Sequence, residues 1–287
     1  MMKRFIYVML VLLALPAVRV NAGKVVTDSL RSDVLGTQVK YNVYLPDGYG
    51  KVGKHYPVIY LLHGLYGTYE DWMNRGTMKG VADEFIRSGE LVPCIIIMPN
   101  AGHPDVHHEW NGYFNMPGWN YEDFFFTEFI PAVEKKYNAG GEKGLRAVMG
   151  LSMGGGGSTV YAQRHPDMFS SCYAMSAWLD NETDAVKRPR ENGDKLQIVC
   201  DSVAEHSALK FIDNADEATI DKLRTVKWFL DCGDDDSLLE LSEGLYHKMR
   251  AAGIKCEFRV RDGVHSWEYW HTALRIALPF ASRNFDE

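Results

Sequence analysis

The pentapeptide Gly150-Leu-Ser-Met-Gly154 holds the residues of this chain best suited to nucleophilic chemistry. It follows an apolar run that ends at Met149 and precedes a helix-like stretch that stops before Pro166. A serine on a tight turn from strand to helix projects its hydroxyl out of the chain, and glycines on either side let neighbouring elements approach. The pattern predicts a nucleophile elbow with Ser152 as the nucleophile.

A glycine-rich turn into a helix can also bind phosphate. Here the run Gly154-Gly-Gly-Gly157 lacks the Gly-Lys-Ser/Thr ending of a P-loop, and it lacks the glycine spacing of a dinucleotide fingerprint. The sequence therefore favours serine catalysis over nucleotide binding, and we expect no cofactor.

Two later apolar runs end in residues that could serve this serine. Val226–Leu230 leads into three consecutive aspartates, residues 234–236, and Cys256–Val260 leads to His265. In α/β-hydrolases the acid and the base follow the serine in this order, on loops at the carboxyl ends of later strands. His265 is the predicted general base, and one of the aspartates should orient its ring. The same acidic run could also stabilise a helix N-terminus.

Acyl transfer also requires two donors directed at the developing oxyanion. The backbone N–H of Met153, next to the nucleophile, is predicted to be one of them. The other is assigned to the N–H of Leu65, in the loop that follows the apolar run Val58–Leu62. His63 in that loop is predicted to be structural.

These residues need a scaffold that brings strand ends together. Apolar runs without alternation, separated by helix-like stretches, are typical of a parallel sheet covered on both faces. The predicted strands are Val58–Leu62, Cys94–Met98, Leu145–Met149, Ser171–Met175, Val226–Leu230 and Cys256–Val260, preceded by an antiparallel pair at Gly23–Leu30 and Thr37–Leu45. The predicted helices are Met78–Ser88, Tyr121–Tyr137, Gly155–Arg164, Leu238–Ala252 and Trp267–Phe280.

The stretch 178–225 departs from this pattern because it is polar, charged and too long for a simple connection. Weak helical patterning covers Asp201–Ile212 and Glu217–Leu223. It is predicted to be either a helical cap over the active site or a surface excursion without function.

The composition excludes several classes of protein. The 287 residues include 46% hydrophobic and 24% charged residues and carry a formal net charge of −7. This balance is typical of a globular chain and makes nucleic acid an unexpected partner. Lys3 and Arg4 precede an apolar stretch and then Val20-Asn-Ala22, which predicts a secretory signal peptide over residues 1–22 and a catalytic domain over 23–287. We therefore expect a periplasmic or secreted protein with no membrane contact after cleavage.

Export permits disulfides, but the five cysteines show no paired framework. Cys94, Cys172, Cys232 and Cys256 accompany apolar runs, where a free cysteine behaves as a small buried hydrophobe. Cys200 is the one expected to be paired or exposed.

Several segments together resemble the esterase D and antigen 85 group of α/β-hydrolases over about residues 37–280. They are Tyr60-Leu-Leu-His-Gly64 with Gly67 and Asp71-Trp72, Met98-Pro-Asn100, Tyr121-Glu-Asp-Phe124, Phe129-Ile-Pro131, Gly150–Gly155, Cys232-Gly-x-x-Asp236 and Gly263-x-His265. The resemblance implies an α/β-hydrolase fold and Asp236 as the triad acid, although Asp234 and Asp235 are unusual beside it. A further similarity of Cys232–Leu238 to feruloyl esterases of carbohydrate esterase family 1 points to that substrate class.

Aromatic residues near the predicted site could stack on sugar rings or on a phenolic acyl group. Trp110, Tyr113, Trp119 and Trp267 are the predicted substrate contacts, although such residues also pack in cores. His103, His107, His108 and Glu109 have spacings that could bind a metal, but they lie in a loop and serine catalysis requires none, so no metal is expected.

The sequence thus predicts a secreted serine carboxylesterase that uses Ser152, Asp236 and His265 on feruloyl or acetyl esters of plant polysaccharide fragments. The partner is a small-molecule or oligosaccharide ester, and the oligomeric state is left open. The alternatives are a short-chain esterase of tributyrin type, an acyltransferase of mycolyl type, and a carbohydrate-binding relative without activity. Export argues against S-formylglutathione, a cytoplasmic substrate.

Overall fold

The computed structural model describes residues 22–51, 54–102, 112–181 and 195–286. Its strands are β1 (Lys24–Arg31), β2 (Gln38–Leu45), β3 (Val58–Leu62), β4 (Ile95–Pro99), β5 (Asn115–Met116), β6 (Trp119–Asn120), β7 (Arg146–Leu151), β8 (Ser171–Met175), β9 (Lys227–Gly233) and β10 (Cys256–Arg261). Its helices are α1 (Asp71–Asn74), α2 (Met78–Ser88), α3 (Tyr121–Phe124), α4 (Ile130–Tyr137), α5 (Met153–Arg164), α6 (Lys195–Glu205), α7 (Ala208–Asn214), α8 (Glu217–Leu223), α9 (Leu239–Ala251) and α10 (Trp267–Ser282). A π-helical turn, Phe125–Phe129, joins α3 to α4, and a 3₁₀ turn, Lys143–Leu145, precedes β7.

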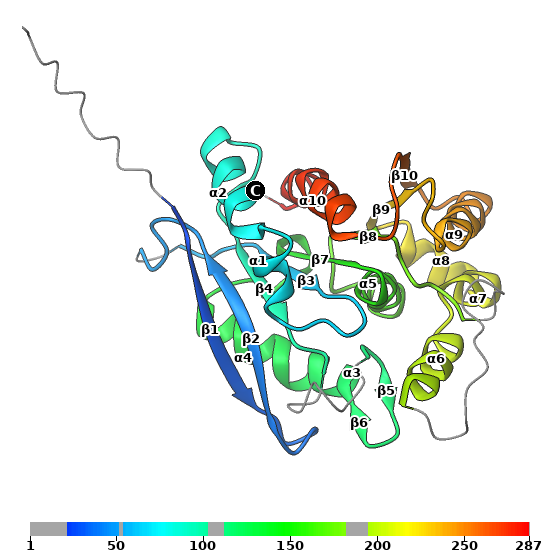
Figure 1. Ribbon diagram of the computed structural model, residues 1–287, viewed down its shortest axis with the longest axis horizontal. Helices are drawn as coiled ribbons and strands as arrows, with labels where there is room; N and C mark the ends of the chain where they lie inside the picture. The colour runs from blue at the N-terminus through cyan, green and yellow to red at the C-terminus, as the bar shows by residue number, and fades with distance from the viewer. Residues whose placement is uncertain (1–21, 52–53, 103–111, 182–194, 287) are drawn as a thin grey trace, which may run out of the picture.

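Eight strands form one sheet in the order β1-β2-β4-β3-β7-β8-β9-β10 (Figure 1). The β1–β2 and β2–β4 pairs are antiparallel, and every pair from β4 to β10 is parallel. This is the mostly parallel sheet of an α/β-hydrolase, as the sequence predicts. Because β3, β7, β8 and β9 run in one direction, their carboxyl ends lie at the same edge of the sheet, where the loops that follow them meet.

Each face of the sheet has its own apolar core because successive side chains of a strand point to opposite faces. Along β3, Val58 and Leu62 belong to the core under α4, α5 and α9, whereas Ile59 and Leu61 belong to the core under α2 and α10. Figure 1 shows α10 and α5 on opposite sides of the central strands. Both faces are covered, which explains why the central strands are apolar without alternation.

The predicted helix Tyr121–Tyr137 is continuous but not uniform, because a π-helical turn interrupts it directly before Ile130 and Pro131. Proline lacks an N–H and cannot donate the bond of a regular α-helix, so a wider turn before it accommodates the missing donor. The weak helical patterning of Asp201–Ile212 does not correspond to a single helix. It falls on two helices, α6 and α7, because the hydroxyl of Ser207 accepts a hydrogen bond from the N–H of Lys210 and starts α7 anew.

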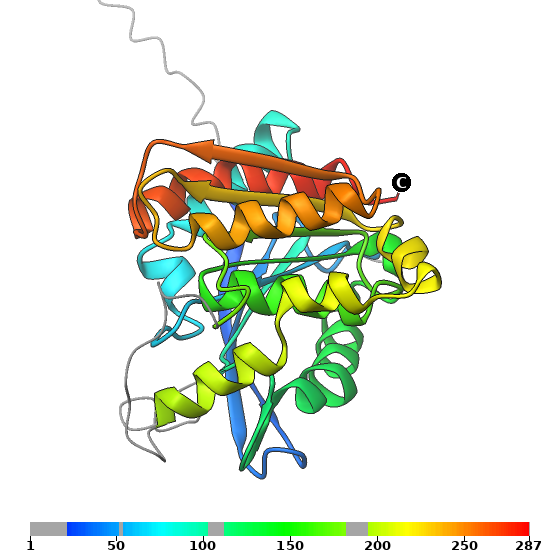
Figure 2. The same cartoon turned by 90° about the vertical axis from the view of Figure 1, so that its right-hand side faces the viewer.

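The stretch 178–225 is helical where it is described, and Figure 2 shows α6, α7 and α8 following one another along the face turned toward the viewer. α7 packs against α5 and α9, so this part of the stretch belongs to the helical layer. Residues 182–194 lie outside the described residues, and the prediction of a cap stays a prediction.

The cysteines correct one expectation. Cys200 is not exposed: it is buried on α6, with 5% of its surface exposed, because it lies on the side of the helix that faces the core. Cys94, Cys172 and Cys232 are free and buried as predicted, and Cys256 on the outer strand β10 is partly exposed. Among the described residues no helix is long and apolar enough to cross a membrane. Predicted signal residues 1–21 lie outside the described part of the chain.

Candidate active site

Ser152 lies between β7 and α5 in a strained backbone conformation, with φ of 54° and ψ of −118°. Its N–H donates to the carbonyl of Met175 at 2.8 Å, and its own carbonyl accepts from the N–H groups of Gly156 and Trp178, each at 3.0 Å. These three bonds to neighbouring elements hold a conformation that a non-glycine residue rarely adopts. The serine hydroxyl is thereby fixed at the start of α5.

The glycines of the elbow are required by close approach. A Cβ on Gly150 would lie 2.5 Å from the carbonyl oxygen of Gly154, and a Cβ on Gly154 would lie 2.5 Å from that of His63. Both separations are too short for any side chain. Gly150 and Gly154 thus allow α5 to begin directly against the ends of β3 and β7.

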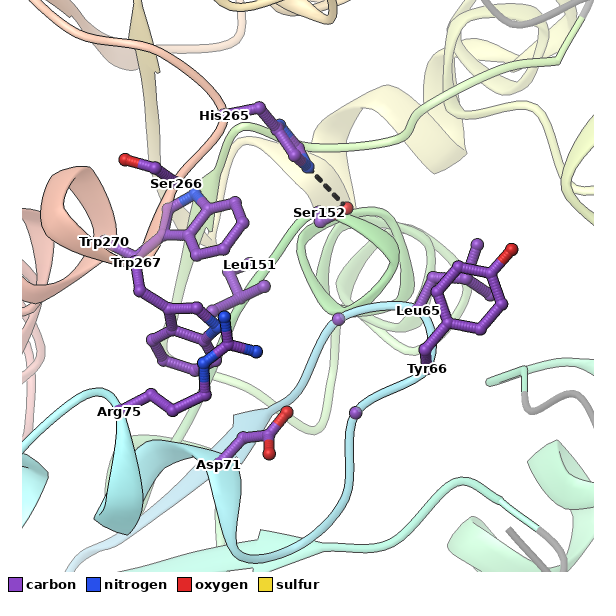
Figure 3. Close-up of a pocket in the computed structure, with 12 residues that line it drawn as sticks. Leu65, Tyr66, Asp71, Arg75, Leu151, Ser152, His265, Ser266, Trp267 and Trp270 are labelled. Carbon is purple, nitrogen blue, oxygen red and sulfur yellow. Dashed lines mark hydrogen bonds between the residues drawn. The ribbon is translucent and has the colours of Figure 1, made fainter. Parts of the chain in front are cut away.

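The structure brings Ser152, His265 and Asp236 together in one chain of hydrogen bonds (Figure 3 shows the first of them). The Ser152 Oγ lies 3.0 Å from His265 Nε2, and His265 Nδ1 lies 2.9 Å and 3.0 Å from the two carboxylate oxygens of Asp236. With Nδ1 protonated toward the carboxylate, Nε2 is the acceptor for the serine proton. This arrangement fits a nucleophile, a base and an orienting acid.

Geometry also separates the three neighbouring aspartates. Asp236 is buried, with 5% of its surface exposed, whereas Asp234 and Asp235 are exposed. The Asp234 carboxylate accepts from the N–H of Gly263 at 2.9 Å, and the N–H of Asp235 donates to the carbonyl of Gly263 at 3.1 Å. These two residues tie the turn after β9 to the loop that carries His265, while Asp236 faces the imidazole.

Burial alone would raise the pKa of Asp236, but its hydrogen bonds outweigh burial and hold that pKa below its usual value. The lowering comes from His265, the N–H of Leu238 at 2.9 Å and the hydroxyl of Ser176. Asp236 therefore stays ionised near neutral pH and can stabilise a protonated His265.

The predicted oxyanion donors flank the serine. Leu65 lines the pocket around Ser152, and Met153 is the first residue of α5. Neither N–H donates a hydrogen bond within the described part of the chain, so both are available to a ligand. Their role in catalysis stays a prediction.

His63 fixes the loop that carries Leu65. Its Nδ1 lies 2.8 Å from the carbonyl oxygen of Gly64, and its Nε2 accepts from the N–H of Ala101 at 3.0 Å. Burial lowers the pKa of His63 to about 4, so the ring is neutral and can hold both bonds. These contacts agree with the structural role expected for His63.

A pocket of about 520 Å³ opens beside Ser152. Its lining includes Leu65, Tyr66, Asp71, Arg75, Leu151, His265, Ser266, Trp267 and Trp270 (Figure 3). Trp267, one of the predicted substrate contacts, lines this pocket, and its contact with substrate stays a prediction. None of the described residues of the stretch 178–225 lines this pocket.

Two of the predicted aromatic contacts do not line this pocket. Tyr113 is 1% exposed and donates its hydroxyl to the carbonyl of His63 at 3.0 Å. Trp119 is 8% exposed and donates its indole N–H to the carbonyl of Ala101 at 3.0 Å. Their polar atoms are satisfied by backbone carbonyls behind the site, so they brace the loops instead of facing this pocket. Trp110 lies outside the described residues.

Asp71, Arg75 and Trp270 are pocket residues that the sequence prediction did not include. Asp71 belongs to a segment of the family resemblance, but nothing in the local pattern around Arg75 marks it as part of the site. Among the described residues no group of three potential metal ligands occurs. The histidines and the glutamate at 103, 107, 108 and 109 lie outside them.

Comparison with known proteins agrees with this geometry. The model of the family named Esterase matches residues 32–281. The chain belongs to this esterase family. A solved structure of a ferulic acid esterase is 50% identical to it, with a TM-score of 0.85, and covers 92% of this chain and 99% of its own.

Curated relatives of this esterase-family chain are more distant. An endo-1,4-beta-xylanase/feruloyl esterase of Xylanibacter ruminicola is 27% identical over 260 residues, which are 89% of this chain and 31% of that protein. The mycolyltransferase Ag85B of Mycobacterium leprae, also named as a diacylglycerol acyltransferase, is 23% identical and covers 86% of this chain and 80% of its own. The chain spans about a third of the length of the first of these curated relatives.

Proposed function

We propose that this chain is a secreted serine carboxylesterase that hydrolyses feruloyl or acetyl esters on plant polysaccharide fragments. The observation that carries the reaction type is the continuous hydrogen-bond chain from Asp236 through His265 to Ser152. The substrate class is supported by the 50% identity to a ferulic acid esterase, which favours feruloyl over acetyl esters. Export is supported by the signal-like pattern of the first 22 residues.

The reaction follows from the geometry. The Oγ of Ser152 attacks the ester carbonyl carbon while His265 Nε2 takes its proton, and the N–H groups of Leu65 and Met153 stabilise the oxyanion. When this intermediate collapses, the protonated His265 gives its proton to the leaving alcohol, and an acyl group remains on Ser152. Water, activated by His265, then attacks that acyl group and releases the acid.

The test compares the wild type with Ser152→Ala on three substrates: methyl ferulate, an acetylated xylo-oligosaccharide and a short-chain nitrophenyl ester. Loss of the nucleophile should lower kcat by about 10⁶-fold on every substrate that the wild type hydrolyses. Methyl ferulate is expected to give the highest kcat/KM of the wild type. Retained activity of Ser152→Ala would contradict the mechanism, and a preference for the nitrophenyl ester would favour the short-chain alternative.

A mycolyl-type acyltransferase is the second candidate because Ag85B aligns with most of the chain. In that case the acyl-enzyme would pass its group to a sugar hydroxyl instead of water. Product analysis with an added sugar acceptor separates the two: free acid alone supports the esterase, and a new sugar ester supports the transferase.

A further inference from the structure

A row of aromatic rings in edge-to-face contact begins at His265 and forms one wall of the pocket, with Trp72 buried behind it. The His265 ring meets the Trp270 ring edge-on at 4.8 Å between centroids, Trp270 meets Trp267 at 5.4 Å, and Trp267 meets Trp72 at 5.3 Å. The rings on either side of Trp267 are anchored, because the indole N–H of Trp72 donates to the carbonyl of Leu62 and that of Trp270 donates to the hydroxyl of Ser176, each at 3.0 Å. The wall is therefore a fixed surface that leads away from the catalytic base.

Arg75 lies at the far end of this wall. Its guanidinium carbon lies 5.1 Å from the centre of a Trp267 ring, and the side chain lines the pocket (Figure 3). Within the described residues this guanidinium donates no hydrogen bond and forms no ion pair. This contact with the ring leaves the N–H donors of the guanidinium free to bind a ligand.

Asp71 places an acceptor in the same part of the pocket. It is half-buried against the loop that carries Leu65, and a Cβ on Gly67 would lie 2.5 Å from its carboxylate oxygen. Burial raises the pKa of Asp71, although the nearby Arg75 and the N–H of Thr68 act in the opposite direction. Figure 3 shows both side chains among the residues that line the pocket.

These groups complement one kind of ligand. A neutral sugar offers hydroxyls that can both donate to Asp71 and accept from Arg75, together with an apolar face that can pack on Trp267. An anionic group would be repelled by Asp71, and a purely apolar group would leave both polar side chains unpaired. The pocket volume of about 520 Å³ leaves room for such a ring.

The proposed reaction decides which part of the ester lies here. His265 must give its proton to the leaving oxygen, so the alcohol part of the substrate lies on the His265 side of Ser152. The wall of Trp270, Trp267 and Arg75 extends from that side. We infer that Trp267, Arg75 and Asp71 form the subsite for the sugar that is the alcohol component of the ester, an inference that rests on the proposed function.

The test measures kcat and KM for two esters of the same acid, methyl ferulate and the ferulate ester of methyl arabinofuranoside. The methyl ester cannot reach the subsite, whereas the sugar ester can. Arg75→Ala should lower kcat/KM about tenfold for the sugar ester, chiefly by raising KM, and change it less than about twofold for the methyl ester. Arg75→Lys, which keeps the charge but loses the planar fork, should fall between the wild type and Arg75→Ala.

Arg275→Ala is the matched control, because Arg275 also stacks on an aromatic ring, at 5.0 Å from Phe85, but does not line the pocket. It should leave the ratio of the two kcat/KM values unchanged. If Arg75→Ala leaves the ratio of the kcat/KM values for the two esters unchanged, the inference of a sugar subsite is overturned. If the wild type hydrolyses neither of these ferulates, the feruloyl form of the proposed function is refuted instead, so the two failures are distinguishable.

Discussion

Two buried aspartates near the end of β9 have opposite kinds of partner. Asp231, within the strand, is 0% exposed and accepts hydrogen bonds from Arg261 at 3.1 Å and from the hydroxyls of Tyr173 and Tyr269. Asp236, in the turn that follows, is 5% exposed and pairs with His265. The partners of Asp231 are a permanently charged guanidinium and two hydroxyls that donate to it, whereas the partner of Asp236 is an imidazole that can exchange a proton.

In the proposed mechanism, one strand end therefore serves both stability and chemistry. The partners of Asp231 come from β8, β10 and α10, so its charge ties together the elements on both sides of the His265 loop. The Asp236 carboxylate instead contacts Nδ1 of His265, whose other ring nitrogen faces Ser152. Substitutions at the two positions should therefore separate folding from catalysis.

The largest effect is expected from Asp236→Asn. The amide keeps the shape of the side chain but no longer stabilises a protonated His265, so kcat on methyl ferulate should fall about 10⁴-fold. Asp231→Asn, measured below its melting temperature, should keep kcat within about tenfold of the wild type. Similar losses in both variants would show that the two carboxylates are not functionally distinct.

The effect on stability should have the opposite order, with a larger loss at Asp231 than at Asp236. Asp231→Ala leaves Arg261 unpaired and two buried tyrosine hydroxyls without their acceptor, so the free energy of unfolding should fall by about 3 kcal/mol. Urea denaturation followed by circular dichroism measures this loss, and Asp236→Asn serves as the comparison, with a smaller decrease. A change below about 1 kcal/mol for Asp231→Ala would mean that the buried ion pair does not hold the fold.

Acid should expose the contribution of Asp236 to stability. Its pKa is lower in the folded chain than its usual value, so the contribution is present above the pKa of the unfolded chain and disappears as pH falls through the lower, folded pKa. The difference in Tm between the wild type and Asp236→Asn should therefore shrink between about pH 6 and about pH 2. A difference that is constant with pH would contradict the lowered pKa.

The smallest effect is expected at the exposed neighbour Asp235. Its side chain does not contact His265 in the triad. Its backbone N–H, which donates to the carbonyl of Gly263, is retained when the side chain is replaced. Asp235→Ala should change the free energy of unfolding by less than about 0.5 kcal/mol and kcat by less than about twofold. A loss of activity like that of Asp236→Asn would reassign the triad acid.

Much of the fold could be predicted because the strands are buried on both faces. The runs at β3 and β8 match their predicted bounds, and the others shift by one to three residues. The two-residue strands β5 and β6 are too short to show a period. The break between α6 and α7 depends on Ser207, whose hydroxyl caps α7 and donates to Asp180, a contact between residues 27 positions apart.

Site residues could be predicted where the reaction requires a fixed order of residues along the chain. They could not be predicted where the folded structure determines which side chain is buried and which faces the pocket. Ser152 and His265 stand in recognisable strand-end motifs. Asp236 was chosen over its two neighbours by resemblance to a family, because only the fold shows which of them is buried. Tyr113 and Trp119 were wrong for this pocket, since their partners, the carbonyls of His63 and Ala101, are 50 and 18 positions away.

The central claim is that Ser152 is the nucleophile activated by His265 and Asp236. Treatment of the folded protein with a fluorophosphonate, followed by mass spectrometry of the intact chain and of its peptides, tests it most directly. One adduct per chain is expected, on the peptide that contains Ser152, and none in Ser152→Ala. An unreactive wild type, or an adduct that persists in Ser152→Ala, would contradict it.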